Sequence, residues 1–185
     1  MDKKTNVTLQ DIYPKYASSH GGGDKGTDHT YIDIYQREMT RRYGASLLEI
    51  GVWEGHSIAM WQEYFEDGYV LGIDIDLSRL KFDCRVEKCN ATSKEDLDSV
   101  IGDMSFNYII DDGSHNPDDQ IRSLELLWDN VAPGGKYFIE DIRGDQEINQ
   151  VMHYVKQNGI SYSLHDNRRL QNRYDDILLV LYKWQ

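Results

Sequence analysis

The stretch NYIIDDGSHNPDDQ, residues 107–120, leads from an apolar run directly into two aspartates and a histidine. Asp111 and Asp112 stand where a buried strand would end, and a second acidic pair, Glu140 and Asp141, ends the apolar run of GGKYFIED. If these strands are neighbours, about 4.8 Å apart, up to four carboxylates converge on one edge of a sheet. Such acids repel one another when unpaired, and a hard divalent cation such as Mg²⁺ relieves the repulsion.

Strand geometry narrows the choice among these four acids. Adjacent residues of a strand point to opposite faces, so one acid of each pair can face a metal while its neighbour turns away. We expect Asp112 and Asp141 to be metal ligands, with Glu140 as a third candidate. We expect Asp111 to face a cofactor or to support the loop. The alternative for all of them is helix capping, which acids at strand ends often perform.

His115 lies three residues beyond Asp112, on a short turn before a helix. A histidine beside a bound hydroxyl group can accept its proton, so His115 is the candidate general base. A lone histidine in a loop is more often a surface residue. We expect His29, in the glycine-rich loop near the start of the chain, to be such a surface residue or to have a structural role.

A second cluster indicates a cofactor. In EIGVWEGHS, Gly51 and Gly55 allow a tight turn and a close approach of the backbone to a ligand, and the helix that follows offers free N–H groups. The next strand ends at Asp74, whose carboxylate can accept hydrogen bonds from both hydroxyls of a ribose. A glycine turn or a strand-end acid also occurs without any ligand. Together they predict a cofactor that carries a nucleoside.

The elements that must position these residues alternate along the chain. A helical period begins at Tyr31, and Gly44 is placed to stop that helix. We expect strands over 45–51, 68–76, 86–92, 106–113, 134–141, 160–166 and 176–184, and further helices over 57–65, 94–102, 116–131 and 146–159. The strands are apolar on both faces, which predicts an α/β fold with a mainly parallel sheet and helices on both faces. Ligands of such sheets lie beyond the carboxyl ends of the strands.

Composition excludes some classes of partner. The chain has 185 residues, 28% of them charged, and a formal net charge of −12. That charge opposes docking on nucleic-acid phosphates and on anionic lipid, so we expect neither nucleic acid nor a membrane as partner. We see no secretory signal and no apolar run of membrane length, and we interpret Cys84 and Cys89 as reduced thiols. These features predict a cytoplasmic protein.

Five segments together resemble a known family. LLEIGVWEGHSIAMW, VLGIDID, VEKCNAT, YIIDDGSH and LLWDNVAPGGKYFIED, in this order, resemble the class I S-adenosylmethionine-dependent methyltransferases over about residues 23–142. The chain is most similar to the metal-dependent sugar O-methyltransferases of macrolide and related antibiotic biosynthesis, and cephalosporin-hydroxylase-like proteins share similar motifs. GGDKGTDHTY, DDGSH and IED indicate this branch. The resemblance implies a Rossmann-like fold with a seven-stranded sheet, an antiparallel terminal strand pair, and S-adenosylmethionine and Mg²⁺ as cofactors.

The resemblance assigns cofactor contacts to individual residues. Glu49 and Gly51 match the acidic-x-glycine motif that faces the methionine part of the cofactor. Asp74 matches the acid that binds the ribose. Asn90 and Ala91 match the pair that follows the third strand and lies against adenine.

The resemblance also assigns the reactive end. Lys25 matches the lysine of an N-terminal element that closes over the cofactor pocket. Asp112 and Asp141 match aspartates that bind magnesium, and His115 matches the proposed general base. The implied division of the chain is an N-terminal segment with a cofactor-covering loop over 1–30, followed by the S-adenosylmethionine-binding domain over 31–185.

The expected function is Mg²⁺-dependent methylation of a hydroxyl group on a small molecule, such as a sugar or a glycosylated natural product. The compact loop that carries Trp53 and Glu54 departs from the family pattern, and the short chain leaves the substrate class less constrained than the cofactor. The alternatives are a catechol-type or metal-independent methyltransferase, and a non-catalytic partner protein that only binds the cofactor. The sequence leaves open whether the chain forms a homo-oligomer. Arg168, Arg169 and Arg173 suit either a solvated hairpin or a contact to an anionic substrate.

Overall fold

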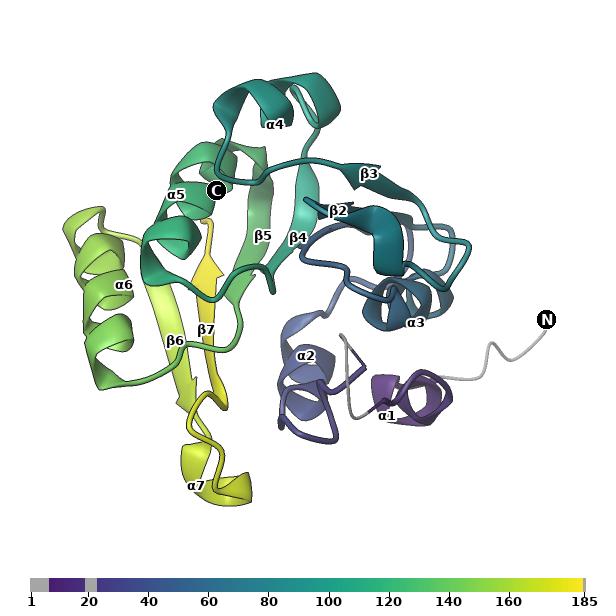
Figure 1. Cartoon of the computed structure of the whole chain (residues 1–185), viewed down its shortest axis with the longest axis horizontal. Helices are drawn as coiled ribbons and strands as arrows, with labels where there is room; N and C mark the ends of the chain where they lie inside the picture. The colour runs from purple at the N-terminus through teal and green to yellow at the C-terminus, as the bar shows by residue number, and fades with distance from the viewer. Residues whose placement is uncertain (1–6, 19–22, 185) are drawn as a thin grey trace.

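Five strands alternate with helices before the chain adds two antiparallel strands at one side of the sheet (Figure 1). This computed structural model describes residues 7–18 and 23–184. The strands are β1 (Ser46–Ile50), β2 (Tyr69–Asp74), β3 (Val86–Lys88), β4 (Phe106–Asp111), β5 (Val131–Ile139), β6 (Ser161–Asp166) and β7 (Ile177–Tyr182). The helices are α1 (Leu9–Ile12), α2 (Ile32–Glu38), α3 (His56–Tyr64), α4 (Lys94–Val100), α5 (Pro117–Leu127), α6 (Asp145–Gln157) and α7 (Arg168–Gln171), with 3-10 turns η1 (Tyr13–Lys15), η2 (Leu77–Arg79) and η3 (Trp128–Asn130).

The sheet has seven strands in the order β3-β2-β1-β4-β5-β7-β6. The first five strands run parallel, and β7 runs antiparallel to both β5 and β6. This arrangement confirms the predicted Rossmann-like fold with a mainly parallel sheet and an antiparallel terminal pair. The amino end of β7 therefore reaches the same edge at which β1, β4 and β5 end.

Helices cover both faces of the sheet (Figure 1). On one face, α1, α2 and α3 contribute residues such as Leu9, Tyr35 and Trp61 to a buried core. On the other face, α4, α5 and α6 contribute residues such as Leu124 and Val151 to a second core. Burying apolar surface on both faces is what a parallel sheet requires.

Strand alternation decides where each strand-end acid points. In β4, Tyr108 and Ile110 face the core of α1–α3, whereas Ile109 faces the core of α4–α6. By the same alternation, Asp111 faces the side of α4–α6 and Asp112 faces the side of α1–α3. The ladder extends just past the strands, because Asp112 N donates to Ile50 O at 2.9 Å. The alternation of apolar residues along β4 therefore fixes the directions in which Asp111 and Asp112 point.

The α5 helix begins as the sequence predicts. Asn116 is its N-cap, and its side chain accepts a hydrogen bond from Asp118 N at 2.9 Å. Pro117 occupies the first helical position, where its missing N–H costs nothing, and two aspartates follow in the first turn. These caps fix the direction in which the chain leaves the turn that carries His115.

The N-terminal segment also contributes a short helix to the core. It is the least core-like part of the sequence, yet Leu9 and Ile12 of α1 are almost fully buried against α2 and α3. A capping box between Thr8 and Asp11 starts α1, a sequence signal that predicts this helix. Residues 1–6 and 19–22, which belong to the expected segment 1–30, lie outside the described residues.

Smaller differences concern element ends. The helix expected to run from Tyr31 to Gly44 already ends at Glu38, and Gly44 instead occupies a turn with φ +57°. The fifth strand begins at Val131 rather than at residue 134. Within residues 7–18 and 23–184, no helix combines the length and apolar character that a membrane crossing requires.

Gly51 provides a stability test of the loop that joins β1 to α3. Its φ is +82°, and a Cβ there would lie 2.0 Å from Asp112 O, so Gly51→Ala combines backbone strain with a collision. We expect a loss of about 2–5 kcal/mol in the free energy of unfolding, measured by urea denaturation. The matched control is Gly134→Ala, which has φ +75° but nothing within 4 Å and should cost only about 1–2 kcal/mol. Equal losses in both variants would contradict the close approach.

Candidate active site

A cavity of about 650 Å³ opens beyond the carboxyl ends of β1, β2 and β4. This volume lies within the usual range for small-molecule sites. The structure brings to its wall eight of the residues expected from the sequence, namely Gly51, Asp74, Asn90, Ala91, Asp111, Asp112, His115 and Asp141. Four other expected residues lie outside the wall: Lys25, Glu49, Gly55 and Glu140.

Asp74 stands at the end of β2, in the wall of the cavity. One carboxylate oxygen accepts hydrogen bonds from Val52 N at 2.8 Å and Trp53 N at 3.0 Å, and the other accepts from Asp76 N at 2.9 Å. A carboxylate has about four acceptor positions, so capacity remains for a ligand hydroxyl. Asp74 thus shapes the glycine loop as well as facing the cavity.

The two glycines of that loop serve the protein backbone. Gly51 allows the loop to pass against the backbone of Asp112 and Gly113. Gly55 adopts φ +90° as the N-cap of α3, and a Cβ there would meet the side chain of Leu80. The tight turn is therefore as expected, and because Gly51 also lines the cavity, the close approach of this loop to a ligand stays a prediction.

Asn90 and Ala91 follow β3 and line the cavity beside Ile73. The side-chain oxygen of Asn90 accepts hydrogen bonds from Thr92 N at 3.0 Å and from the Thr92 hydroxyl at 2.8 Å. This turn holds the apolar Ala91 against the wall. Trp53, which is 45% exposed, borders the same cavity and lies under the guanidinium group of Arg79, 3.6 Å from the ring centroid.

At the other end of the cavity, Asp112, His115 and Asp141 come together. One potential ligand atom from each residue lies within 4.8 Å of those of the other two. His115 and Asp141 both adopt left-handed backbone conformations, with φ +55° and +54°. For residues other than glycine this conformation is uncommon and strained, and such strain often accompanies functional sites.

The His115 ring stands at the cavity with its Nδ1 buried and without a hydrogen-bond partner among the described residues. Its Nε2 lies 4.0 Å from Asp141 Oδ2. Burial lowers the pKa of His115 below its ordinary value, although the charge of Asp112 opposes this. The ring is therefore neutral near pH 7 and able to accept a proton.

Lys25 is only 1% exposed and does not line the cavity, although its neighbour Asp24 does; closure of this element over a bound cofactor stays a prediction. Its Nζ donates to Asp112 Oδ2 at 2.6 Å and to both oxygens of Glu140 at 2.7 and 2.8 Å, and it lies 3.3 Å from Glu49 Oε1. Burial alone would lower the pKa of Lys25, but the three carboxylates raise it well above its usual value. Lys25 is therefore a permanent buried cation.

The two fully buried acids of this cluster have further partners. Glu49 accepts hydrogen bonds from the Ser57 hydroxyl at 2.8 Å and from Trp61 Nε1 at 3.4 Å. Glu140 accepts a hydrogen bond from the hydroxyl group of Tyr35. Burial raises the pKa values of both acids, and Lys25 opposes the shift. As a metal ligand Glu140 stays a prediction, because in this arrangement both of its oxygens bind Lys25.

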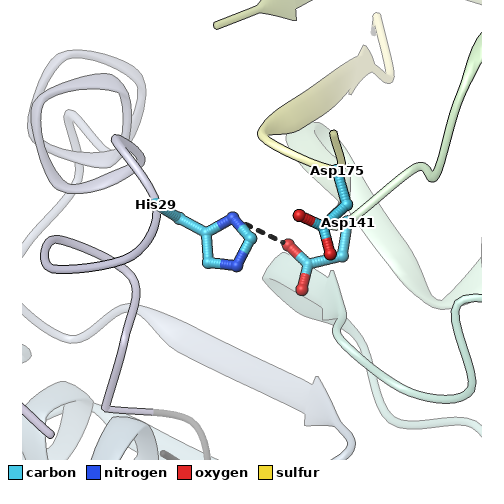
Figure 2. Close-up of side chains that lie close together, drawn as sticks. All are labelled: His29, Asp141 and Asp175. Atoms are coloured by element: carbon cyan, nitrogen blue, oxygen red, sulfur yellow. Dashed lines mark ion pairs between the residues drawn. The ribbon is translucent and has the colours of Figure 1, made fainter. Parts of the chain in front are cut away.

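Asp141 is contacted by Tyr31 and His29, for which the sequence predicts no catalytic or binding role. Its Oδ1 accepts a hydrogen bond from the Tyr31 hydroxyl at 2.9 Å and lies 3.3 Å from His29 Nδ1 (Figure 2). His29 is 1% exposed, so the solvent-exposed alternative for this histidine is wrong. Burial, followed by the charge of Asp112, raises the pKa of Asp141 well above its usual value.

Two of the three arginines between β6 and β7 are paired with acids. Arg168 binds Asp145 at 2.8 Å and Asp166 at 2.7 Å, and Arg173 binds Asp28 and Asp175. These pairs favour the interpretation as a hairpin surface over that of an anion site.

The comparisons with known proteins agree with this geometry. A family model described as a methyltransferase domain matches residues 48–142, which is just over half of the chain. The chain belongs to this family. Within the family it is 34% identical over 137 residues to 8-demethyl-8-alpha-L-rhamnosyl tetracenomycin-C 2'-O-methyltransferase of Streptomyces olivaceus, covering 66% of this chain and 35% of the relative. It is 30% identical over 157 residues to demethylmacrocin O-methyltransferase of Streptomyces fradiae, covering 74% and 35%.

Solved structures support the fold of this methyltransferase-domain protein. MycE methyltransferase from the mycinamycin biosynthetic pathway, in complex with Mg, SAH and mycinamycin VI, superimposes with a TM-score of 0.76 at 23% identity. The match covers 98% of this chain and 54% of that structure. The chain spans about a third of the length of the curated relatives it matches.

Asp111 offers a test of the site's electrostatics. Burial raises its pKa from 3.8 to about 7, so the folded state keeps a proton that the unfolded chain releases. Stability should fall as the pH rises from about 4 to 7, and Asp111→Asn should remove this loss. We expect the variant to exceed the wild type by about 2–4 kcal/mol at pH 8 and to equal it near pH 4, measured by urea unfolding.

The control is Asp98→Asn on the exposed surface of α4, which should show no such difference between the two pH values. If Asp111→Asn is instead destabilised at pH 8, the carboxylate is ionised and stabilised in the folded protein.

Proposed function

We propose that this chain binds S-adenosylmethionine and transfers its methyl group to a hydroxyl group of a small molecule, with Mg²⁺ at the acid cluster. The observation that carries the proposal is a single cavity with two chemically different ends. Asp74 and the apolar wall of Ile73 and Ala91 stand at one end, and Asp112, His115 and Asp141 at the other. A donor and an acceptor bound in that cavity would meet between the two ends.

The relatives support this proposal and its acceptor class. Their names specify methylation of rhamnosyl tetracenomycin-C at 2'-O, of demethylmacrocin, and of mycinamicin VI at 2''-O. We infer that the acceptor here is also a sugar hydroxyl, on a free or glycosylated small molecule. The net charge of −12 is consistent with a partner other than nucleic acid or anionic lipid. A cytoplasmic location and a homo-oligomer stay predictions.

The residues at the nucleoside end suit the cofactor. The Asp74 carboxylate retains acceptor capacity toward the cavity, as a ribose requires. Ile73 and Ala91 offer apolar surface to a base, and the Asn90 turn holds that surface in place. Glu49 is held by Ser57, Trp61 and Lys25 outside the described wall, and its contact with the methionine part of the cofactor stays a prediction.

The residues at the acid end suit a divalent cation. Asp112 and Asp141 supply carboxylate oxygens, the ligands that Mg²⁺ prefers, and the potential ligand atoms of these two and His115 are mutually within 4.8 Å. A cation there would supply a Lewis acid that makes a nearby hydroxyl group more acidic. Lys25 already neutralises part of the negative charge, and its hydrogen bond positions Asp112.

His115 suits the transfer of the proton. A hydroxyl group becomes a good nucleophile only as its proton leaves, and the neutral imidazole at the cavity can accept that proton. The left-handed backbone at His115 and the capped start of α5 hold the ring at the acceptor side. Its chemical role is therefore separable from cofactor binding.

Two other functions stay open to test. A catechol-type or metal-independent methyltransferase would use the same cofactor end, and acceptor profiling would separate it from a sugar enzyme. A non-catalytic partner protein would bind the cofactor without transfer. The convergence of Asp112, His115 and Asp141 favours catalysis, because binding alone needs no such set.

The cofactor assignment predicts that Asp74→Asn weakens binding of S-adenosylhomocysteine in calorimetry. Loss of charge-assisted hydrogen bonds to the ribose should cost about 1.5–3 kcal/mol, or about 10- to 150-fold in Kd. The matched control is Asp76→Asn. Asp76 also follows β2, but it caps η2 and does not line the cavity, so affinity should stay near the wild-type value. A wild-type protein that binds NAD but not S-adenosylhomocysteine would refute the assignment.

The base assignment predicts that His115→Ala lowers kcat by about 10²-fold or more, with little change in affinity for S-adenosylhomocysteine. The assay is transfer of a labelled methyl group to demethylmacrocin, mycinamicin VI and a catechol. Because burial lowers the pKa of His115, the acidic limb of the kcat profile should lie below pH 6.5. His153→Ala, on the exposed side of α6, is the control.

Near-wild-type kcat in His115→Ala would show that another group takes the proton. If the wild type binds S-adenosylhomocysteine but methylates none of the acceptors, the non-catalytic alternative is favoured.

A further inference from the structure

Behind the cavity, three side chains from distant parts of the chain converge on one point. His29 comes from the loop before α2, Asp141 from the end of β5, and Asp175 from the loop before β7 (Figure 2). One potential ligand atom from each lies within 4.8 Å of those of the other two. We propose that His29, Asp141 and Asp175 form a second divalent-cation site, joined to the cavity through the Asp141 carboxylate.

His29 is the strongest indication of a missing partner. Its side chain is 1% exposed, and neither ring nitrogen has a hydrogen-bond partner among the described residues. The ring stacks on Tyr31, with centroids 4.9 Å apart, which fixes its plane. Its Nδ1 points toward Asp141 Oδ1 at 3.3 Å, in the direction that Figure 2 shows. A buried imidazole without hydrogen bonds is unfavourable, and a cation bound at Nδ1 would give it a partner.

The two oxygens of Asp141 face different directions. Oδ1 lies on the side of His29, and Oδ2 lies 4.0 Å from His115 Nε2 on the cavity side. A carboxylate in this position can bind one cation through each oxygen. Asp141 is thus the member common to the cavity group and to the buried group.

Neighbouring residues leave Asp175 room for another partner. Arg173 Nε donates to Asp175 Oδ1 at 2.7 Å, and Arg173 Nη1 binds Asp28 at 3.1 Å. Within residues 7–18 and 23–184, the second oxygen of Asp175 has no hydrogen bond. Asp176 is also buried and accepts hydrogen bonds from Thr30 N at 3.1 Å and from the Thr30 hydroxyl at 3.0 Å. It therefore holds the loop in place rather than acting as a ligand.

The ligand set selects the class of ion. One imidazole nitrogen and two carboxylates suit Mn²⁺, Fe²⁺ or Zn²⁺ better than Mg²⁺, which prefers oxygen ligands alone. The buried site should therefore prefer the transition ions, while the cavity site accepts Mg²⁺. Bound there, the ion would tie the N-terminal loop to β5 and to the last hairpin, and it would orient Asp141 from behind.

The test is titration of the full chain with Mn²⁺, followed by the free-ion signal in electron paramagnetic resonance. We expect about two ions per chain in the wild type. His29→Gln and Asp175→Asn should each bind about one ion, and so should Asp112→Asn, which affects the cavity site instead. An excess of Mg²⁺ should displace one ion from the wild type and from His29→Gln, but should displace little from Asp112→Asn.

The matched control is Asp24→Asn. It removes a negative charge 4.0 Å from His29 Nε2, on the other side of the ring; Asp24 lines the cavity but belongs to neither ligand group, so the number of bound ions should stay unchanged. Circular dichroism identifies any variant that fails to fold, and Asp175→Asn then replaces His29→Gln. Equal Mn²⁺ stoichiometry in the wild type and in folded His29→Gln and Asp175→Asn would overturn the second site. Loss of ions only in Asp112→Asn would overturn it as well, while leaving the cavity metal intact.

Discussion

A single ammonium group holds the reactive edge of this protein together. Lys25 Nζ lies within 3.3 Å of a carboxylate inside β1, Glu49, and of two that directly follow β4 and β5, Asp112 and Glu140; all but Asp112 are almost fully buried. Without it, three acids would face one another in a region with little water. Removing one partner from such a buried cluster typically costs about 3–5 kcal/mol. The N-terminal loop is therefore joined to the sheet by charge as well as by the apolar contacts of α1.

Successive residues of a strand face opposite sides of the sheet, which explains why one acid of each pair binds Lys25 and the other does not. Asp112 and Glu140 lie on the face of α1–α3, together with Lys25, whereas Asp111 lies on the opposite face near Tyr137. Asp112 is bound by Lys25 and still lines the cavity. It therefore connects the structural part of the edge with the part that is open to small molecules.

The sequence predicts the architecture well because its strands are apolar on both faces and end at polar residues. It predicts Asp112, His115 and Asp141 as one group because parallel strands end at a common edge. It does not predict the partners of Lys25, since a lysine in a glycine-rich loop gives no sign that three acids will surround it. It does not predict that His29 and Asp175 meet, since they are 146 residues apart and come together only because β7 returns antiparallel to the edge where β5 ends. The capping box of Thr8 and Asp11 was a readable signal for α1.

The direction of β7 also decides at which edge of the sheet the protein can carry a label or a tether. Its amino end, next to Asp175 and Asp176, contributes to the reactive edge, and its other end leaves the sheet where Gly134 N donates to Lys183 O at 2.8 Å. Trp184 beyond it is 72% exposed. A fluorophore or a surface tether placed at Trp184 would thus lie at the far edge of the sheet, and the opening of the cavity would stay accessible to diffusing molecules.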